Sequence, residues 1–299
     1  MRFYHLALAL LVSAIWGLNF VVIHYGLKEI SPQLLCMSRF AGASFPAIFF
    51  IKKPKAPFKL IILYGLVMFA IQFTLLFFGM QLGVSPSLSS LLMQTQVFLT
   101  IFLAFLFLGE KANHWQLLGA VVSFSGIVLV GRHIDGHLSL LGFILIIAAA
   151  LAWSIGNLIS KKIGQVNMFS LVVWGSFIAW IPLFLMSLYT EGLSDMIHIF
   201  THLSWVSIIA VLYTTYLSTV VGYVSWNWLL SKYDAAVIVP FTLLVPIFAF
   251  LGATLLLREP LQPWKLIAAT LVVTGLCISL LAQRLILQWK SRYAAVKPC

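Results

Sequence analysis

The chain has 299 residues, of which 62% are apolar and only 8% are charged. A soluble globular domain carries roughly 25% charged residues, so the composition excludes a fully water-exposed surface. It also excludes intrinsic disorder, because disordered chains are poor in the apolar residues that dominate here. The net charge of +11 would suggest a nucleic-acid partner in a soluble protein, whereas in a membrane protein the placement of the charges matters more than their sum.

The apolar residues form runs that are long enough to cross a bilayer as helices. Each span needs about 20 mostly apolar residues, and helices pair their backbone groups internally in lipid. Alternating segments of about ten residues, which are typical of a membrane β-barrel, do not occur. The sequence therefore predicts an all-α membrane protein with ten transmembrane helices. In chain order these are His5–His24, Gln33–Ile51, Phe58–Gln81, Ser87–Leu108, His114–Gly131, Leu138–Ser160, Phe169–Tyr189, Leu203–Trp228, Ala235–Leu257 and Trp264–Leu287.

Lysine and arginine set the expected orientation. If the N-terminus is cytoplasmic, the loops Lys52–Lys59 and Lys161–Lys162 and the basic tail all lie inside. The positive-inside rule then predicts that both termini are cytoplasmic. The basic residues left on the outside are Lys28, Arg132, Arg258 and Lys265.

Motifs recur at a spacing of about half the chain. Leu106–Glu110 resembles Leu255–Glu259, and Trp115 matches Trp264, in each case 149 residues apart. Because five is an odd number, a second set of five helices enters the membrane from the opposite side, as in the inverted repeats of secondary transporters. The expected units are a first repeat at 1–137, an inverted second repeat at 138–287 and a short basic tail at 288–299.

Polar residues inside a span are costly and mark candidate functional positions. All seven Asp and Glu residues fall in loops or at span ends, so a proton relay through a buried carboxylate is not expected. Polar and aromatic groups concentrate instead in spans one, three, four, six, eight and nine. The residues expected along a substrate pathway are Trp16, Asn19, Arg39, Gln72, Gln94, Trp153, Asn157, Tyr213, Tyr216 and Thr242.

Two of these features have alternative interpretations. Arg39, the only charge within a span, either snorkels towards the membrane surface or holds a substrate carboxylate inside the cavity. Pro240 and Pro246 bend span nine by removing helical hydrogen bonds. The bend is either a static kink or a hinge beside the pathway, and the hinge is our hypothesis.

Small residues and cysteines give less specific signals. Gly119 and Gly126 share one face of span five, and Ala268 and Gly275 share one face of span ten. This pattern favours close helix packing, either within the bundle or between protomers, and it leaves the oligomeric state open. Without a CxxC, HExxH or P-loop motif, the sequence predicts neither a metal site nor a cofactor nor direct use of ATP.

Several motifs together resemble the EamA family of the drug/metabolite transporter superfamily. Ile15–Val22 resembles the first-helix signature of that family, and Ser38–Phe40 resembles its Arg-Phe element. Leu108–Glu110 and Arg258–Pro260 resemble the Glu-bearing motif that ends the fourth helix of each repeat. One departure is Arg258, at a position where relatives often carry Gly or Asp. Val221–Tyr223 and Leu244–Pro246 fit spans eight and nine of the same family.

The resemblance implies ten helices, a bacterial inner-membrane location with both termini cytoplasmic, and export of small amino-acid metabolites such as cysteine and O-acetylserine. The hypothesis is therefore a secondary transporter that works by alternating access, with the bilayer and a small-molecule substrate as partners. Transport of another small neutral solute, such as a drug, nucleobase or vitamin, is the alternative. A membrane enzyme is less expected, because no nucleophile, acid pair or metal cluster has the required spacing. A channel is also disfavoured, because no charged ring or carbonyl filter motif occurs.

Overall fold

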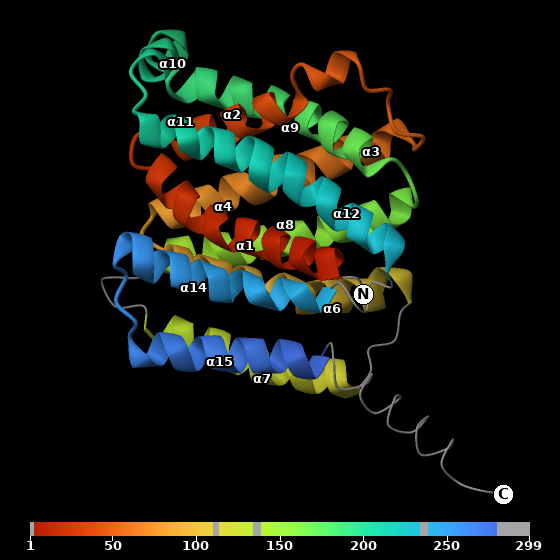
Figure 1. The fold of residues 1–299 in the computed structure, drawn as a ribbon, viewed down its shortest axis with the longest axis vertical. Coiled ribbons are helices and arrows are strands. Elements are labelled where there is room, and N and C mark those ends of the chain that lie inside the picture. Colours follow the sequence, from red (N-terminus) through yellow and green to blue (C-terminus); the bar gives the residue numbers. More distant parts are fainter. Residues whose placement is uncertain (1–2, 110–113, 134–138, 234–238, 280–299) are drawn as a thin grey trace, which may run out of the picture.

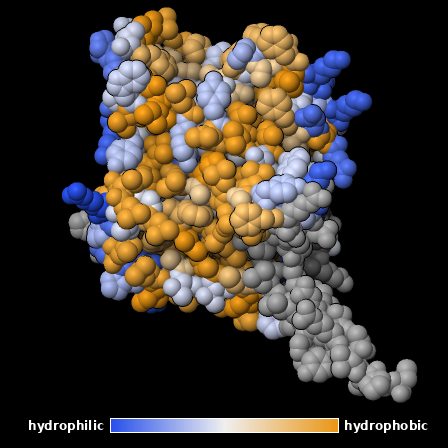
Figure 2. Space-filling model, in the orientation of Figure 1, coloured by the Kyte–Doolittle hydropathy of each residue, from blue (hydrophilic) through white to orange (hydrophobic). Residues whose placement is uncertain are grey.

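The computed structural model describes residues 3–109, 114–133, 139–233 and 239–279, and every regular element in these ranges is a helix. The helices run roughly side by side, and their ends lie at two opposite edges of the molecule (Figure 1). Apolar side chains cover the face between these edges, whereas hydrophilic residues gather at the edges themselves (Figure 2). This apolar belt is the surface expected of a protein surrounded by lipid.

The first half of the chain contains α1 to α7. Helix α1 (Phe3–Gly26) is followed by α2 (Pro32–Ser44) and the short η1 (Ala47–Phe49). A continuous helical run then comprises α3 (Phe58–Tyr64), the π-helical η2 (Gly65–Ile71) and α4 (Gln72–Gln81). Helices α5 (Pro86–Met93) and α6 (Thr95–Leu108) follow, and α7 (His114–Arg132) completes the half.

The second half repeats this order with one addition. It contains α8 (Leu140–Ile163), α9 (Met168–Thr190) and the short α10 (Gly192–Thr201). A second continuous run comprises α11 (Trp205–Leu212), the π-helical η3 (Tyr213–Val221) and α12 (Gly222–Lys232). The described part ends with η4 (Val239–Leu243), α14 (Leu244–Leu257) and α15 (Pro263–Cys277).

Seven helical segments within the described residues are long and apolar enough to cross a membrane. Two shorter apolar helices, Phe241–Leu257 and Pro263–Cys277, accompany them. The predicted all-helical membrane class is confirmed, whereas the number of ten crossings stays a prediction. The end of the tenth predicted span, 280–287, and the tail lie outside the described residues.

Local sequence explains where several helices begin. Ser31 precedes α2, and its hydroxyl accepts a hydrogen bond from the Leu34 N–H, with Pro32 in the first turn. Asn167 caps α9 in the same way, through the Ser170 N–H. Such caps satisfy backbone donors that have no partner within the helix.

Three elements differ from the predicted spans. Helix α2 ends at Ser44 rather than continuing to Ile51, because the ring of Pro46 forces Phe45 into an extended conformation. Span four is interrupted at Gln94, between α5 and α6. The additional helix α10 is amphipathic, with Leu193, Ile197 and Phe200 exposed on one face, a pattern typical of helices that lie in the membrane surface.

Irregular backbone recurs at matching places in the two halves. The π-helical segments η2 and η3 overlap when 149 is added to the residue numbers of η2. Helices α6 and α14 both end in a residue with left-handed backbone, Gly109 with φ 67° and Arg258 with φ 54°. The break at Gln94 corresponds to the start of α14 after Leu243. These pairs share the spacing of the sequence repeat.

Helices α7 and α15 form a pair at one side of the bundle (Figure 1). An ideal Cβ on Gly119 would lie 2.3 Å from the Gly275 carbonyl oxygen, and one on Gly126 would lie 2.8 Å from that of Ala268. The small residues therefore let the two backbones approach closely, as predicted. The sequence allowed close packing either within the bundle or between protomers. The observed contact lies within one chain and is therefore of the first kind.

Candidate substrate site

A cavity of about 80 Å³, lined by both apolar and polar residues, lies between helices of both halves. Six of the ten predicted pathway residues line it. These are Trp16, Asn19, Arg39, Gln94, Trp153 and Thr242. The remaining lining residues are Phe20, Phe73, Leu76, Ser90, Met93, Gln96, Ser218, Tyr223 and Val245.

Helix α1 contributes an aromatic wall and a polar group. The Trp16 indole N–H donates to the Ser218 carbonyl oxygen at 3.1 Å, and its ring packs against Tyr223 at 5.6 Å between centroids. One turn further on, Asn19 is buried, and its Oδ1 has no hydrogen-bond partner within the described residues. The cavity thus contains an unsatisfied hydrogen-bond acceptor.

Arg39 points into the cavity rather than towards the membrane surface, and its side chain is only 1% exposed. Its Nε donates to Thr219 Oγ1 at 2.9 Å, and one terminal nitrogen donates to Ser218 Oγ at 3.3 Å. The guanidinium also lies 4.0 Å from the centre of the Phe73 ring. The structure therefore contradicts snorkelling, whereas the binding of a substrate carboxylate stays a prediction.

The charge of Arg39 is not neutralised by any carboxylate within the described residues. The other terminal nitrogen, Nη1, is buried and has no hydrogen-bond partner there. Burying a guanidinium without a counter-ion costs several kcal/mol. An ionisable residue inside a membrane domain is a candidate functional residue for this reason.

The break between α5 and α6 brings an amide to the cavity. The Gln94 Nε2 donates to the Thr242 carbonyl oxygen at 3.1 Å, so the break in the first half contacts the corresponding region of the second half. Asn157 lies behind this wall and donates to Gln96 Oε1 at 3.4 Å and Thr100 Oγ1 at 3.2 Å. Asn157 therefore orients a lining residue without lining the cavity itself.

Three other predicted residues are not brought to the cavity. Gln72 is completely buried, and neither of its amide atoms has a partner within the described residues. Tyr213 donates its hydroxyl to the Ile15 carbonyl oxygen at 2.9 Å and joins two helices. Tyr216 is 48% exposed at the outer surface. The wider turn of a π-helix shifts the face on which successive residues lie, which α-helical spacing does not anticipate.

The two prolines lie at the start of a helix rather than within one. Pro240 falls in the 3₁₀ turn η4, and Pro246 lies in the first turn of α14. First-turn N–H groups have no partner within the helix, so Pro246 removes no α-helical hydrogen bond. The helix type changes from 3₁₀ to α after Leu243. A hinge at this place stays a prediction.

Ser218, Tyr223 and Phe73 were missed by the sequence reasoning. Ser218 and Thr219 lie in span eight, one of the spans in which polar groups concentrate, but their proximity to Arg39 depends on η3. Phe73 gave no signal because an apolar aromatic residue in a span is expected everywhere. Phe73 follows Gln72 in the sequence. The side of α4 that faces the cavity is therefore the side of Phe73 and not that of Gln72, the predicted residue.

The fold and the cavity define a helical membrane protein of the transporter class. The family model described as "EamA-like transporter family" matches residues 4–132 and 140–281. The chain therefore belongs to the EamA-like transporter family, as its motifs indicate.

Curated relatives carry consistent names. Over 283 residues the chain is 39% identical to a protein of Escherichia coli (strain K12) named "Probable amino-acid metabolite efflux pump", and the match covers 93% of this chain and 95% of that protein. Its counterpart in Salmonella typhimurium (strain LT2) is 38% identical with the same coverage. A "Probable terminal-alkyne amino-acid exporter" of Streptantibioticus cattleyicolor is 24% identical over 276 residues, covering 88% of this chain and 89% of that protein.

A solved crystal structure shares the fold. It superposes with a TM-score of 0.65 and covers 94% of this chain and 99% of its own, at 15% sequence identity. At this identity the likeness concerns the fold alone.

Proposed function

We propose that the chain exports small amino-acid metabolites of the cysteine and O-acetylserine type by alternating access. The observation that supports this most directly is the pair of unsatisfied polar atoms in one cavity, the Arg39 Nη1 donor and the Asn19 Oδ1 acceptor. An α-amino acid carries the complementary groups, a carboxylate and an ammonium.

Arg39 supplies the carboxylate subsite. A guanidinium binds a carboxylate through two parallel N–H···O bonds, and Nη1 is available for one of them. Binding restores a counter-ion to the buried charge, which makes the occupied cavity more favourable than the empty one.

Asn19 supplies an acceptor for the ammonium group. Its neutral oxygen accepts a hydrogen bond from an N–H⁺ group without adding charge to the membrane interior. The aromatic rings of Trp16 and Trp153 form apolar walls around the rest of the solute. Gln94 and Thr242 are further polar residues that line the cavity.

The cavity volume favours a small metabolite over the alternative of a drug. Roughly 10–15 Å³ holds one water on this scale, so about 80 Å³ accommodates a solute of a few heavy atoms. Sites for drug-sized ligands are typically ~300–1,000 Å³.

The contacts between the halves support two inverted five-helix repeats. Adding 149 to Gly119 and Gly126 gives Ala268 and Gly275, and the observed contacts are Gly119 with Gly275 and Gly126 with Ala268. This reciprocal pairing is what a two-fold relation between α7 and α15 produces. The bundle interior shows the same reciprocity. Helix α1 of the first half packs against α14 of the second, and α8 of the second half packs against α6 of the first.

The proposed location is a bacterial inner membrane with both termini cytoplasmic. The basis is the positive-inside rule, since Lys52 and Lys53 follow α2 and η1, and Lys161 and Lys162 lie in the last turn of α8, at the same edge of the bundle. Glu29, Glu191 and Glu259 lie at the opposite edge, here called the acidic end, which this topology places outside.

Mass spectrometry of culture medium tests the proposal. Cells that make the chain are compared with cells that make Asn19→Ala at equal abundance. We expect cysteine, O-acetylserine or a related metabolite to accumulate outside only with the unmodified chain. Matching media would contradict export of amino-acid metabolites and would favour another solute.

A further inference from the structure

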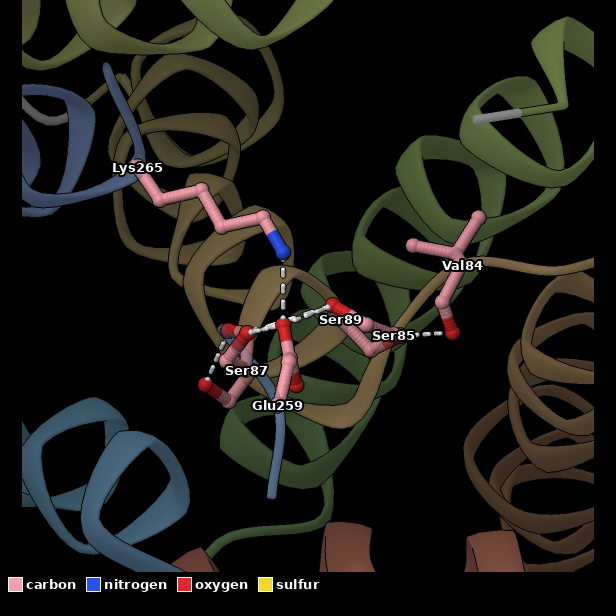
Figure 3. Close-up of polar contacts among 7 residues, drawn as sticks. Val84, Ser85, Ser87, Ser89, Glu259 and Lys265 are labelled. Carbon is pink, nitrogen blue, oxygen red and sulfur yellow. Dashed lines mark hydrogen bonds and ion pairs between the residues drawn. The ribbon is translucent and has the colours of Figure 1, made fainter. Parts of the chain in front are cut away.

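A partly buried cluster at the acidic end joins the two halves of the chain through one carboxylate oxygen. Glu259 Oε1 accepts from Ser85 Oγ at 2.7 Å, from Ser87 Oγ at 2.5 Å and from Lys265 Nζ at 2.8 Å (Figure 3). Ser85 and Ser87 belong to the first half, whereas Glu259 and Lys265 belong to the second. We call these four residues the Glu259 cluster.

The cluster fastens the ends of two helices that line the cavity. Ser87 lies in the first turn of α5, and its carbonyl oxygen accepts from Ser90 Oγ at 2.7 Å; Ser90 lines the cavity. Glu259 follows α14, which lines the cavity through Val245. Parting the serines from Glu259 therefore separates α5 from α14 above the cavity.

A third lining helix converges on the same point. The Tyr25 hydroxyl of α1 donates to the Leu256 carbonyl oxygen at 2.9 Å, in the last turn of α14. One turn earlier in α14, an ideal Cβ on Gly252 would lie 2.7 Å from Leu18 Cδ2, so α1 and α14 pack tightly there. Helices α1, α5 and α14 thus close together between the cavity and the acidic end.

The charges of the Glu259 cluster are arranged so that its hydrogen bonds to the serines can break without leaving the carboxylate unpaired. Lys265 lies six residues after Glu259, in the first turn of α15, so the ion pair can move with the second half when the serines are released. The carboxylate then keeps its counter-ion and avoids the cost of an isolated charge. Only hydrogen bonds from two hydroxyls are lost, and water replaces them at an opened surface.

We propose that the Glu259 cluster is the gate of the acidic end, closed as observed here and opened when α5 and α14 part to release substrate. The inference rests on the proposed alternating access. It does not depend on which solute is carried.

Thiol labelling tests the gate without any substrate. The three native cysteines Cys36, Cys277 and Cys299 are replaced, and Ser90→Cys, a buried lining position, reports access to the cavity. A membrane-impermeant thiol reagent is applied separately to each face of the membrane. Labelling of Pro260→Cys, at an exposed position, identifies the face that carries the cluster.

Two changes should open the gate. Glu259→Gln removes charge-assisted hydrogen bonds, each worth about a tenfold change in an equilibrium or more. We expect Ser90→Cys to react on the order of tenfold faster from the Glu259 face in this background. Ser85→Ala with Ser87→Ala should act in the same direction while leaving the ion pair intact, which guards against a Glu259 variant that does not fold.

The matched control is Glu191→Gln. This carboxylate also lies at the acidic end and also accepts a hydrogen bond across the halves, from Ser31, but its helix α9 contributes no described lining residue. We expect no change in labelling. Equal labelling rates in the control and in both gate variants would overturn the proposal, as would a faster reaction from the opposite face alone.

Discussion

Ser123 donates a hydrogen bond of 2.9 Å to the carbonyl oxygen of Val272, the residue that lies 149 positions later. The same spacing relates the two π-helical segments and the two left-handed helix ends. Ser123 and Val272 therefore lie at the centre of the reciprocal contact between α7 and α15. This contact is a local feature whose strength can be measured.

Gly275→Ala should destabilise the protein. Its new Cβ would lie 2.3 Å from Ser123 Oγ and 2.4 Å from the Gly119 carbonyl oxygen, so the backbones must move apart. Overpacking of this kind costs about 1–3 kcal/mol. The control is Gly131→Ala in α7. An ideal Cβ on Gly131 would lie 3.9 Å from Phe143 Cζ, its nearest neighbour among the described residues. Thermal unfolding in detergent should separate the two variants, and equal midpoints would contradict this packing.

Gly109 and Arg258 end their helices with left-handed backbone. We therefore expect a change to glycine at Arg258 and a change from glycine at Gly109 to shift the free energy of unfolding in opposite directions. Glycine adopts this conformation readily, whereas other residues lose about 1–2 kcal/mol. Arg258→Gly should therefore raise the free energy of unfolding by about 1 kcal/mol, and Gly109→Ala should lower it by a similar amount. Among the described residues, no heavy atom lies within 4 Å of an ideal Cβ on Gly109, so its substitution reports conformation alone. Shifts of the same sign would refute the explanation.

Gln72→Met separates stability from transport. The buried amide has no partner within the described residues, and an unsatisfied buried polar group costs about 1–3 kcal/mol. The apolar side chain of similar length should raise the unfolding temperature. If Gln72 also serves the pathway, as the sequence predicts, transport by the stabilised variant should fall. Unchanged transport would remove Gln72 from the pathway, and a lower unfolding temperature would show that the amide is satisfied.

Glu29 should make stability depend on acid pH. Hydrogen bonds from Ser207 and Ser204 hold the pKa of its carboxyl below the ordinary value. A group whose pKa is lower in the folded state stabilises the fold above its unfolded pKa, near 4.5, and loses that contribution as the pH falls through the folded pKa. Unfolding temperatures of the unmodified chain and Glu29→Gln should differ at neutral pH and converge once the pH falls below the folded-state pKa of Glu29. A constant difference would contradict this linkage.

Hydropathy located most helices because a span in lipid must be both long and apolar. Helices α1 and α9 begin and end within a few residues of their predicted spans. Span two was predicted too long, because Pro46 ends α2 at Ser44 although the residues after it are apolar. Helix α10 was missed because an amphipathic helix of ten residues lacks the length of a span.

The site was predicted in part, for a comparable reason. Polar residues such as Asn19 and Gln94 stand out in an apolar sequence, and they line the cavity. The orientation of Tyr216 and the contact between Arg39 and Ser218 depend on the π-helical turn, which leaves no periodic signal. Arg39 could not be assigned from depth alone, because its direction is set by Thr219 and Ser218 on another helix.

Transport of a carboxylate by Arg39 variants tests the central proposal most directly. Purified protein in vesicles is given labelled cysteine or its decarboxylated analogue cysteamine, and uptake is compared between the unmodified chain, Arg39→Lys and Arg39→Gln. The unmodified chain should prefer cysteine, and Arg39→Gln should lose that preference by about 10-fold or more, because a hydrogen bond to a charged group is worth about 1.5–3 kcal/mol. Arg39→Lys should retain part of it through charge alone. An unmodified chain that carries both solutes equally, or an Arg39→Gln variant with unchanged preference, would contradict a carboxylate site at Arg39.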